Sequence, residues 1–198
     1  MRSVQSYLVF DFETSGLDRS ADRIIQVGLC TVSEGEVVDR RGWLVKQDVR
    51  IDPEAMARHR ITARDLQARG IPPQESLANL LQAMRAAPTC MGHNTHQFDI
   101  PFMLAESRRL GMEPPDCTDF IDTAALFKGW KLGLSKRDNE SFKVYADRVL
   151  SRRVTGLKYS IPACLKELRI KPGPGQLHDA SQDAYLTHLI FHALQRVL

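Results

Sequence analysis

Two acidic residues within an apolar stretch constrain this chain more than any other feature of its sequence. The stretch from Val9 to Gly16 reads VFDFETSG, with Asp11 and Glu13 one residue apart. Because residues i and i+2 of a β-strand point to the same side, the two carboxylates project together. Like charges this close repel each other unless a positive charge compensates them. The stretch therefore needs a positive partner.

The size and composition of the chain are those of one soluble domain. Its 198 residues suffice for one well-buried core, so we expect a single domain over residues 1–198. The four cysteines form no C-x-x-C pair, and neither a signal peptide nor an apolar run of membrane-spanning length is present. We therefore expect a cytoplasmic protein with reduced thiols, no zinc site and no membrane partner.

The positive charge is concentrated in one segment. The formal net charge is +3, but the segment from Asp122 to Lys158 holds nine Lys or Arg and four acids, which gives +5 and leaves −2 for the remainder. The simplest interpretation of such a segment is a solvated face. Contact with a nucleic acid, for which Arg152 and Arg153 are the candidates, is favoured over it if the substrate is a polyanion.

Hydrophobic periodicity and turn residues predict a mixed α/β sheet. The expected strands are Tyr7–Phe10, Arg23–Val32, Glu36–Val45, Thr89–Gly92 and Asp119–Asp122. The expected helices are Pro53–His59, Ala63–Ala68, Gln74–Ala87, a helix with Pro101 in its first turn that runs to about Leu110, Ser160–Leu168 and Ser181–Val197. The polar stretch Lys131–Tyr145 is not assigned, and Lys171–Gly175 (KPGPG) is expected to be neither helix nor regular strand.

Two further stretches carry acids at the starts of predicted helices. GHNTHQFDIPF places Asp99 at a helix start just after a short strand. In HDASQDA, Asp179 and Gln182 have the spacing of a helix cap with a return hydrogen bond, which puts Asp183 in the first turn and His178 just outside it. The sequence shows no Ser/His/Asp or Cys/His arrangement and no glycine-rich phosphate loop. Any chemistry therefore rests on the acids and one histidine.

Three stretches of the chain resemble the motifs of the DEDDh exonuclease family: Asp11-x-Glu13, Asn94-x-x-x-Phe98-Asp99 and His178-x-x-x-x-Asp183. This family includes the proofreading epsilon subunit of bacterial DNA polymerase III, RNase T and oligoribonuclease. The resemblance runs from about residue 7 to residue 197. It implies an RNase H-like sheet, with three leading antiparallel strands followed by parallel strands and flanked by helices.

The resemblance implies a role for each motif residue. One divalent ion would be bound by Asp11, Glu13 and Asp183, and Asp11 would bridge to a second ion whose site Asp99 completes. His178 would be the general base that deprotonates the attacking water. These roles agree with the general chemistry of paired Mg²⁺ or Mn²⁺ ions in phosphoryl displacement and with the ordinary pKa of histidine.

By the same resemblance, the last nucleotide of a single strand would sit on the segment after Glu13. The residues expected to line this site are Thr14, Gly16, Leu17, His93, Asn94 and Phe98. Backbone near Thr14 would meet the 3′-hydroxyl, Leu17 would pack on the base, and Phe98 offers a stacking face. The side chain of Asn94 is expected to tie the strand end to the loop that carries Asp99.

Two features depart from the family pattern, and the other histidines stay outside the predicted chemistry. Gln26 stands where many relatives have glutamate, and the basic region over residues 122–171 is longer than in compact members. We interpret His59, His96, His188 and His192 as non-catalytic.

The sequence thus predicts a metal-dependent 3′→5′ exonuclease that releases nucleoside 5′-monophosphates from single-stranded ends. DNA is favoured over RNA because the chain resembles the polymerase epsilon group more than oligoribonuclease, and an RNA-trimming enzyme is the first alternative. A non-catalytic binding or scaffold module is the second, although it would be expected to lack at least one of the five motif residues. A D-x-D phosphatase would need an aspartate in place of Glu13. Because the sequence stops at Leu198 within the last predicted helix, we expect no polymerase or clamp tether, and the resemblance allows a homodimer.

Overall fold

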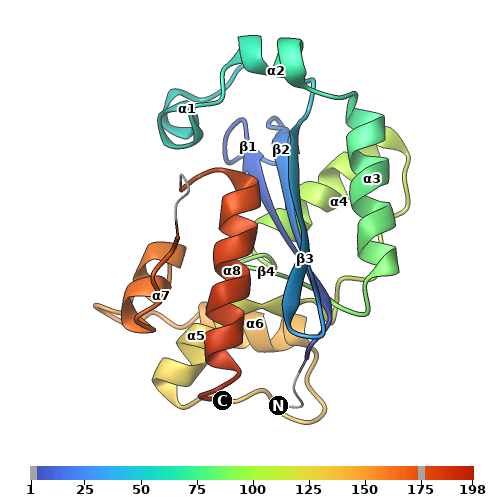
Figure 1. Cartoon of the computed structure of the whole chain (residues 1–198). Helices are drawn as coiled ribbons and strands as arrows, with labels where there is room; N and C mark the ends of the chain where they lie inside the picture. Colours follow the sequence, from blue (N-terminus) through green and yellow to red (C-terminus); the bar gives the residue numbers. More distant parts are fainter. Residues whose placement is uncertain (1–3, 174–176) are drawn as a thin grey trace.

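The computed structural model describes residues 4–173 and 177–198, and a five-stranded sheet lies at its centre (Figure 1). The strands are β1 (Tyr7–Thr14), β2 (Ile24–Ser33), β3 (Glu36–Leu44), β4 (Cys90–Gly92) and β5 (Ile121–Asp122). Their order across the sheet is β3-β2-β1-β4-β5. The pairs β1–β2 and β2–β3 are antiparallel, whereas β1–β4 and β4–β5 are parallel. The expected mixed sheet is confirmed.

Eight helices surround this sheet in the described residues. They are α1 (Pro53–His59), α2 (Ala63–Arg69), α3 (Pro73–Ala86), α4 (Asp99–Leu110), α5 (Thr123–Leu132), α6 (Phe142–Leu150), α7 (Ile161–Glu167) and α8 (Ala180–Leu194). None of these helices is both long and apolar enough to cross a membrane. Within the predicted non-regular segment Lys171–Gly175, residues 171–173 lie outside helices and strands, and residues 174–175 fall outside the described part of the chain.

Helices α5 and α6 were not predicted from the sequence. Every residue from Thr123 to Gly129 is buried, so α5 lacks the alternation of polar and apolar faces that reveals a surface helix. Helix α6 is short, and its signals are a Ser141 cap, whose hydroxyl accepts from the Val144 N–H, and one buried face. Much of the basic region is therefore regular structure.

Strand β1 places its two acids on the face of the sheet that α8 covers. Val9 packs in the core formed with α5 to α8, whereas Phe10 packs on the opposite side with α3 and α4. Since side chains alternate along a strand, Asp11 and Glu13 share the face of Val9. Strand β1 is four residues longer than predicted because its pairing with β2 continues past both acids.

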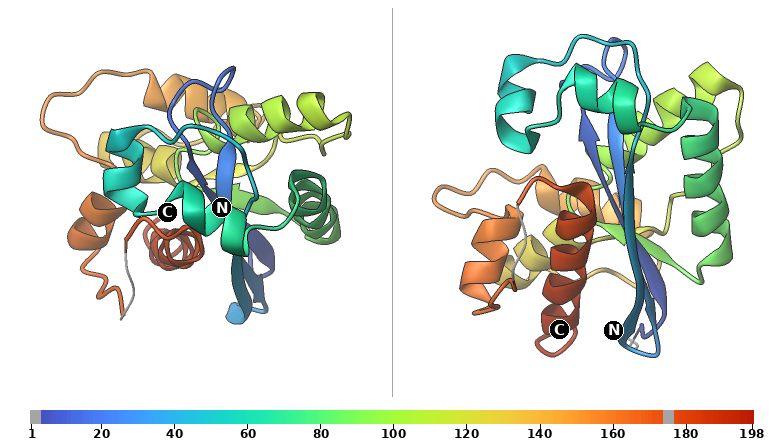
Figure 2. Two further views of the ribbon diagram at one scale, coloured as in Figure 1. Left: turned by 90° about the horizontal axis from the view of Figure 1, so that it is seen from above. Right: turned by 45° about the horizontal axis from the view of Figure 1, so that its top comes forward.

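The end of β1 and the start of α8 lie at the same end of the sheet. Figure 1 shows this end at the top, and Figure 2 shows α1 and α2 lying over it. The backbone N–H of Asp52, the N-cap of α1, donates to the carbonyl of Ser15 at 2.7 Å, which ties this cover to the segment after β1. The predicted motifs therefore converge on one end of the sheet.

Candidate active site

Four carboxylates from three elements meet at the end of β1. Asp11 and Glu13 come from the strand, Asp99 is the first residue of α4, and Asp183 lies in the first turn of α8. Asp99 is buried, and its Oδ1 accepts a hydrogen bond from the backbone N–H of Phe12 at 3.1 Å. The structure thus brings together the acids that the sequence predicted.

Burial raises the pKa of every acid in this cluster, and repulsion within the cluster adds to the shifts of Asp11 and Glu13. Burial raises the pKa of Asp11 well above its ordinary value, and the charges of Asp99, Asp183 and Glu13 raise it further. The pKa of Glu13 rises to about 8, through burial first and then through Asp183 and Asp99. Burial also raises the pKa of Asp99 to about 8 and that of Asp183 to about 6. Without a cation, this cluster favours bound protons near neutral pH.

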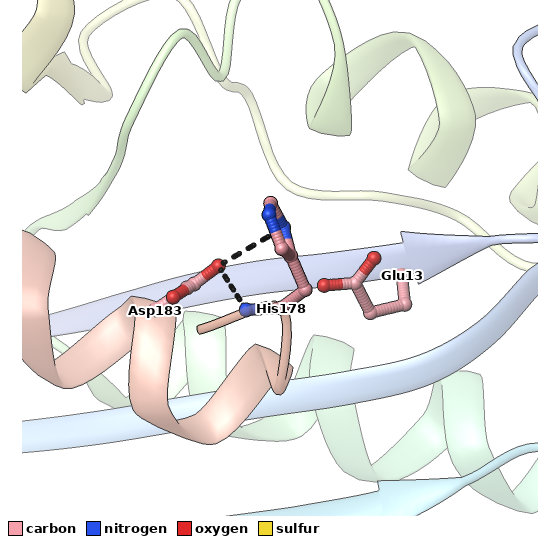
Figure 3. Close-up of side chains that lie close together, drawn as sticks. All are labelled: Glu13, His178 and Asp183. Carbon is pink, nitrogen blue, oxygen red and sulfur yellow. Dashed lines mark hydrogen bonds and ion pairs between the residues drawn. The ribbon is translucent and has the colours of Figure 1, made fainter. Parts of the chain in front are cut away.

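His178 lies beside two of these acids (Figure 3). Ligand atoms of Glu13, His178 and Asp183 all lie within 4.8 Å of one another. The backbone N–H of His178 donates to Asp183 Oδ2 at 3.2 Å, and its ring Nδ1 lies 4.0 Å from the same oxygen. His178 is exposed and has a left-handed φ of 64°, a conformation that is unfavourable for a residue with a side chain. His178 therefore lies just outside the first turn of α8, as predicted, and beside Asp183.

Gly28 on β2 allows the start of α8 to approach this cluster. Gly28 pairs with Asp11 in the register of β1 and β2, and a Cβ at Gly28 would overlap the backbone of Ala180. Gln26, two residues earlier, holds the same helix start: its Nε2 donates to Asp179 Oδ2 at 2.9 Å, and its Oε1 accepts from the Ala180 N–H at 3.1 Å. The sequence indicated that Gln26 keeps the capacity for hydrogen bonds but loses a charge, and it indicated no role for Gly28.

The predicted cap of α8 is confirmed in one half and wrong in the other. Asp179 is the N-cap, and its Oδ1 accepts from the Gln182 N–H at 3.1 Å. Among the hydrogen bonds of the described residues, the expected return bond from the Gln182 side chain is missing. Its Oε1 instead accepts a hydrogen bond from the guanidinium of Arg40 on β3, because the sheet lies within reach of this side chain.

Replacing Gly28 by alanine should displace the start of α8 and with it Asp183. We expect the Gly28→Ala variant to lose most metal-dependent activity and to unfold at lower temperature, because an added methyl group would overlap backbone, which has little freedom to move. The matched control is Gly42→Ala on β3. Gly42 pairs directly with Gly28, but its Cβ would lie 3.1 Å from the Cβ of Ser181 and 3.2 Å from the Val27 carbonyl, a tight contact rather than an overlap.

Activity assays and thermal unfolding of both variants check this expectation. Equal losses in the two variants would contradict the specific role of Gly28.

The segment after β1 forms a rigid turn. The hydroxyl of Thr14 donates to the carbonyl of Gly16 at 2.6 Å, so Thr14 offers its backbone rather than its hydroxyl to a ligand. The hydroxyl of Ser15 donates to Asp22 Oδ1 at 2.7 Å, and a Cβ at Gly16 would overlap this carboxylate. Leu17 is 78% exposed. Thr14 and Gly16 are buried, so Leu17 is the one predicted contact of this segment that is exposed to a nucleotide.

The other predicted wall is formed by three residues after β4. Both ring nitrogens of His93 are within hydrogen-bond distance of protein oxygens, the Thr123 hydroxyl at 2.9 Å and the Tyr159 carbonyl at 2.7 Å. Asn94 has a left-handed φ of 60°, and its Oδ1 is buried with no hydrogen-bond partner in the described residues. The ring of Phe98 packs against the core beside α3 and α4. His93 therefore offers a ligand its ring face rather than a free nitrogen.

Asp122 holds the loop between β4 and α4, a role that was not predicted from the sequence. Its carboxylate accepts backbone hydrogen bonds from Asn94 at 3.0 Å and from His96 at 3.2 Å. It also caps α5 by accepting from Ala124 and Ala125. The signal in the sequence was an acid between a short strand and Thr-Ala-Ala, a pattern typical of an N-cap.

His59 also lies at the edge of the site. It is the last residue of α1 and is buried, with Nδ1 accepting from the Ile61 N–H at 3.0 Å. Burial lowers its pKa, nearby His178 lowers it further, and the Thr14 backbone opposes the shift. Its Nε2 is buried with no hydrogen-bond partner in the described residues. His59 therefore stands between the segment after β1 and His178, a position that the sequence did not reveal.

Comparison with known proteins agrees with this geometry. A model of the exonuclease family matches residues 8–191. The chain belongs to the exonuclease family. Its three motifs lie together at one end of the five-stranded sheet, the arrangement expected of a DEDD-type exonuclease domain.

Individual relatives are much longer than this chain. The PolC-type DNA polymerase III of Thermotoga petrophila is 27% identical over an alignment of 198 positions. The alignment covers 94% of this chain and 12% of the polymerase. Escherichia coli exonuclease I in complex with a dA16 oligonucleotide has a similar fold, with a TM-score of 0.76 and 18% identity. That match covers 98% of this chain and 41% of exonuclease I. A zinc-bound form of an exonuclease I complex with single-stranded DNA gives a TM-score of 0.68 at 17% identity, over 98% of this chain and 41% of that one.

The raised pKa values of the acids predict how the stability of the metal-free protein depends on pH. A carboxyl group that holds its proton more tightly when folded stabilises the fold fully below its unfolded pKa, and this stability is lost as pH rises through the folded pKa. The free energy of unfolding in EDTA should therefore fall between about pH 4 and about pH 8, the ordinary and raised pKa values of Glu13 and Asp99. Mn²⁺ should restore most of the loss at pH 8.

Urea unfolding across this pH range, with and without Mn²⁺, provides the measurement. The Glu13→Gln variant is the control and should show a weaker fall, since it lacks one titrating group. A wild-type stability in EDTA that rises steadily to pH 8 would contradict the predicted sign.

Proposed function

We propose that the domain hydrolyses single-stranded nucleic acid from its 3′ end and releases nucleoside 5′-monophosphates. The observation that carries this proposal is the convergence of four carboxylates with raised pKa values, two of which lie beside one exposed histidine. Buried acids in such number are unfavourable unless cations compensate them. The arrangement therefore fits a metal-dependent hydrolase better than a binding or scaffold module.

The donor set fits two hard divalent cations such as Mg²⁺ or Mn²⁺, which prefer carboxylate oxygens. Oδ1 of Asp183 is buried and has no hydrogen-bond partner in the described residues, as expected of an oxygen reserved for a ligand. We assign Asp11, Glu13 and Asp183 to one ion, and Asp11 with Asp99 to the other. When bound, such ions polarise the phosphodiester and stabilise charge on the attacking and leaving oxygens.

The residues of the chain supply the proton transfer and hold the strand end. His178 accepts a proton from the attacking water, and the carboxylate of Asp183, 4.0 Å from Nδ1, stabilises the resulting imidazolium. The water oxygen bonds to phosphorus, the bond from phosphorus to the O3′ of the preceding nucleotide breaks, and that O3′ takes a proton from solvent. The released nucleotide keeps its 5′-phosphate. The turn from Thr14 to Leu17 holds its sugar and base.

DNA is the substrate that we favour. Exonuclease I has been crystallised with DNA oligonucleotides, and the PolC-type relatives are DNA polymerases. RNA trimming remains the alternative. An enzyme distinguishes RNA from DNA through contacts to the 2′-hydroxyl, and none of the assigned residues is assigned to such a contact.

A panel of 5′-labelled single-stranded DNA and RNA oligonucleotides, incubated with Mg²⁺ or Mn²⁺, tests the proposal. We expect a ladder of labelled products that shortens by one nucleotide at a time, with nucleoside 5′-monophosphates released and DNA degraded faster. Faster degradation of RNA would select the alternative. Immediate release of the labelled end nucleotide, or no degradation of either nucleic acid, would contradict the proposal.

Neutralising Arg152 and Arg153 should weaken binding of single strands. Both side chains are exposed and follow α6. For each phosphate that the variant no longer neutralises, the slope of log affinity against log salt should decrease by about 0.7 for a single strand. The control carries Arg41→Gln and Arg85→Gln, which remove the same charge from exposed positions on β3 and α3.

Fluorescence anisotropy at several salt concentrations measures both slopes. An unchanged slope in the Arg152→Gln, Arg153→Gln variant would show that this segment is a solvated face and does not contact the nucleic acid.

A further inference from the structure

A hollow of about 410 Å³ lies between α2, the end of α1, strand β3 and the start of α8; we call it the α2 hollow. Its polar lining includes His59 and Arg60 at the end of α1, Arg69 on α2, Arg40 on β3 and Gln182 on α8. His178 borders it as well. Among the described residues, none of those assigned to the metal ions or to the last nucleotide lines the α2 hollow. It is therefore a separate feature that the hydrolysis of a strand end does not use.

The wall of the α2 hollow carries more positive charge than its acids neutralise. Three arginines line it, together with the two aspartates Asp65 and Asp179. Arg69 pairs with Asp65 at 2.8 Å. Arg40 and Arg60 make no ion pair within residues 4–173 and 177–198. Because a guanidinium group presents several donors in a fixed plane, two unpaired arginines favour an anion with oxygen acceptors.

The two acids of the α2 hollow are already occupied by the protein. Each carboxylate accepts three hydrogen bonds, and for Asp65 two of these come from Thr62. Those of Asp179 include bonds from the side chains of Ser181 and Gln26. A ligand that needs acceptors, such as a metal cation, would therefore find few of them at this wall.

Two further side chains leave hydrogen-bond donors without partners. Gln182 is 2% exposed, its Oε1 accepts from Arg40, and its amide nitrogen donates no hydrogen bond within the described residues. The Nδ1 atom of His59 accepts from the Ile61 N–H, so the neutral ring carries its proton on Nε2. That atom is buried and has no hydrogen-bond partner in the part of the chain that the structure describes, although the Thr14 backbone lies nearby. Polar groups buried this far are normally paired, which indicates that a ligand supplies the acceptors.

A phosphate group fits this wall better than the other classes of ligand. It carries negative charge for the two arginines and several acceptor oxygens for the neutral donors. An apolar ligand would leave the same donors buried and unpaired, which is unfavourable. The volume of the α2 hollow lies within the usual range of ligand pockets and leaves room for a substituent on the phosphate.

We propose that the α2 hollow binds a phosphate-type oxyanion, either the free ion or the phosphate group of a mononucleotide, through Arg40, Arg60 and Gln182. The inference does not depend on the proposed function, because it uses neither the four carboxylates nor a strand end. It gives the domain a phosphate site that needs no metal ion.

Calorimetric titration with inorganic phosphate in EDTA, at constant ionic strength and pH 7, tests this inference. Without metal ions the acid cluster offers phosphate no positive charge, so binding there is not expected. For the wild-type protein we expect saturable binding of one phosphate per chain. A nucleoside 5′-monophosphate, titrated in the same way, distinguishes the two sources: tighter binding than phosphate would identify the mononucleotide as the ligand, and weaker binding the free ion.

Two variants change the α2 hollow, and a third serves as the matched control. Arg60→Gln should weaken phosphate binding by roughly 10-fold or more, because it removes a hydrogen bond between charged groups. Gln182→Glu keeps the shape of the side chain but replaces the amide donor by a carboxylate, and it should weaken binding at least as much. Arg64→Gln removes the same charge from an exposed position on α2 outside the hollow and should leave phosphate binding nearly unchanged.

Absence of saturable phosphate binding by the wild-type protein would overturn the inference. Equal weakening in Arg60→Gln and Arg64→Gln would also overturn it, since the effect would then come from net charge alone. Failure of the proposed function would appear instead as absence of hydrolysis in Mn²⁺, which the titration in EDTA does not depend on.

Discussion

Replacing Asp11 by asparagine should abolish hydrolysis and stabilise the metal-free protein at the same time. Asp11 is assigned to both ions, so its loss should lower the rate on the order of 10³-fold or more. The same change removes a charge from a cluster in which Asp99, Asp183 and Glu13 all raise its pKa. At pH 8 and in EDTA we expect the free energy of unfolding to increase by roughly 1–3 kcal/mol.

A variant that loses activity but gains stability identifies the acid cluster as functional, whereas loss of an acid with a structural role should lower stability. The rate is measured on labelled single-stranded DNA with Mn²⁺, and stability by urea unfolding in EDTA. Asp179→Asn is the matched control: this aspartate is the cap of α8, and hydrogen bonds from Ser181 and Gln26 lower its pKa despite partial burial. That variant should lose stability. A loss of stability in Asp11→Asn would refute the interpretation of the cluster as a site of uncompensated charge.

The second large effect is expected at His178. Replacing this general base by alanine should lower the rate by about 10²- to 10⁴-fold, because the attacking water then loses its proton acceptor. Metal affinity should change little, since the four carboxylates remain. The backbone N–H that donates to Asp183 Oδ2 also remains in the variant.

Pre-steady-state cleavage and Mn²⁺ titration of the His178→Ala variant give the two values needed. His192→Ala is a suitable control, because His192 lies in the last turn of α8, at the opposite end of that helix. If His178→Ala turns over substrate as fast as the wild type, His178 is not the general base. Loss of Mn²⁺ binding would instead make His178 a ligand.

Local signals in the sequence predicted those parts of the site that lie within single motifs. The period of β1 correctly placed Asp11 and Glu13 on one side, and the D-x-x-Q spacing correctly placed Asp183 in a first helical turn. Helices α1 and α2 begin where Pro53 and Thr62 predicted them. These signals are read within a few residues, and the structure agrees with them.

Features that depend on tertiary contact were not predictable from one sequence. The importance of Gly28 depends on Ala180, about 150 positions later, whose backbone approaches it. His59 gave no local sign that its helix lies over the end of β1. Helix α5 was missed because burial on all sides removes the periodic signal. The return bond of Gln182 was predicted but is replaced by Arg40, a residue from another element.

The central claim is that the four carboxylates hold divalent cations, and calorimetric titration with Mn²⁺ at pH 7.5 tests it most directly. In the presence of nucleoside 5′-monophosphate we predict two Mn²⁺ ions per wild-type chain. Asp99→Asn should retain one, because Asp99 is assigned to only one ion, and Asp11→Asn should bind far more weakly at both positions. No saturable binding of Mn²⁺ by the wild-type protein, or the same stoichiometry in all three proteins, would contradict the account.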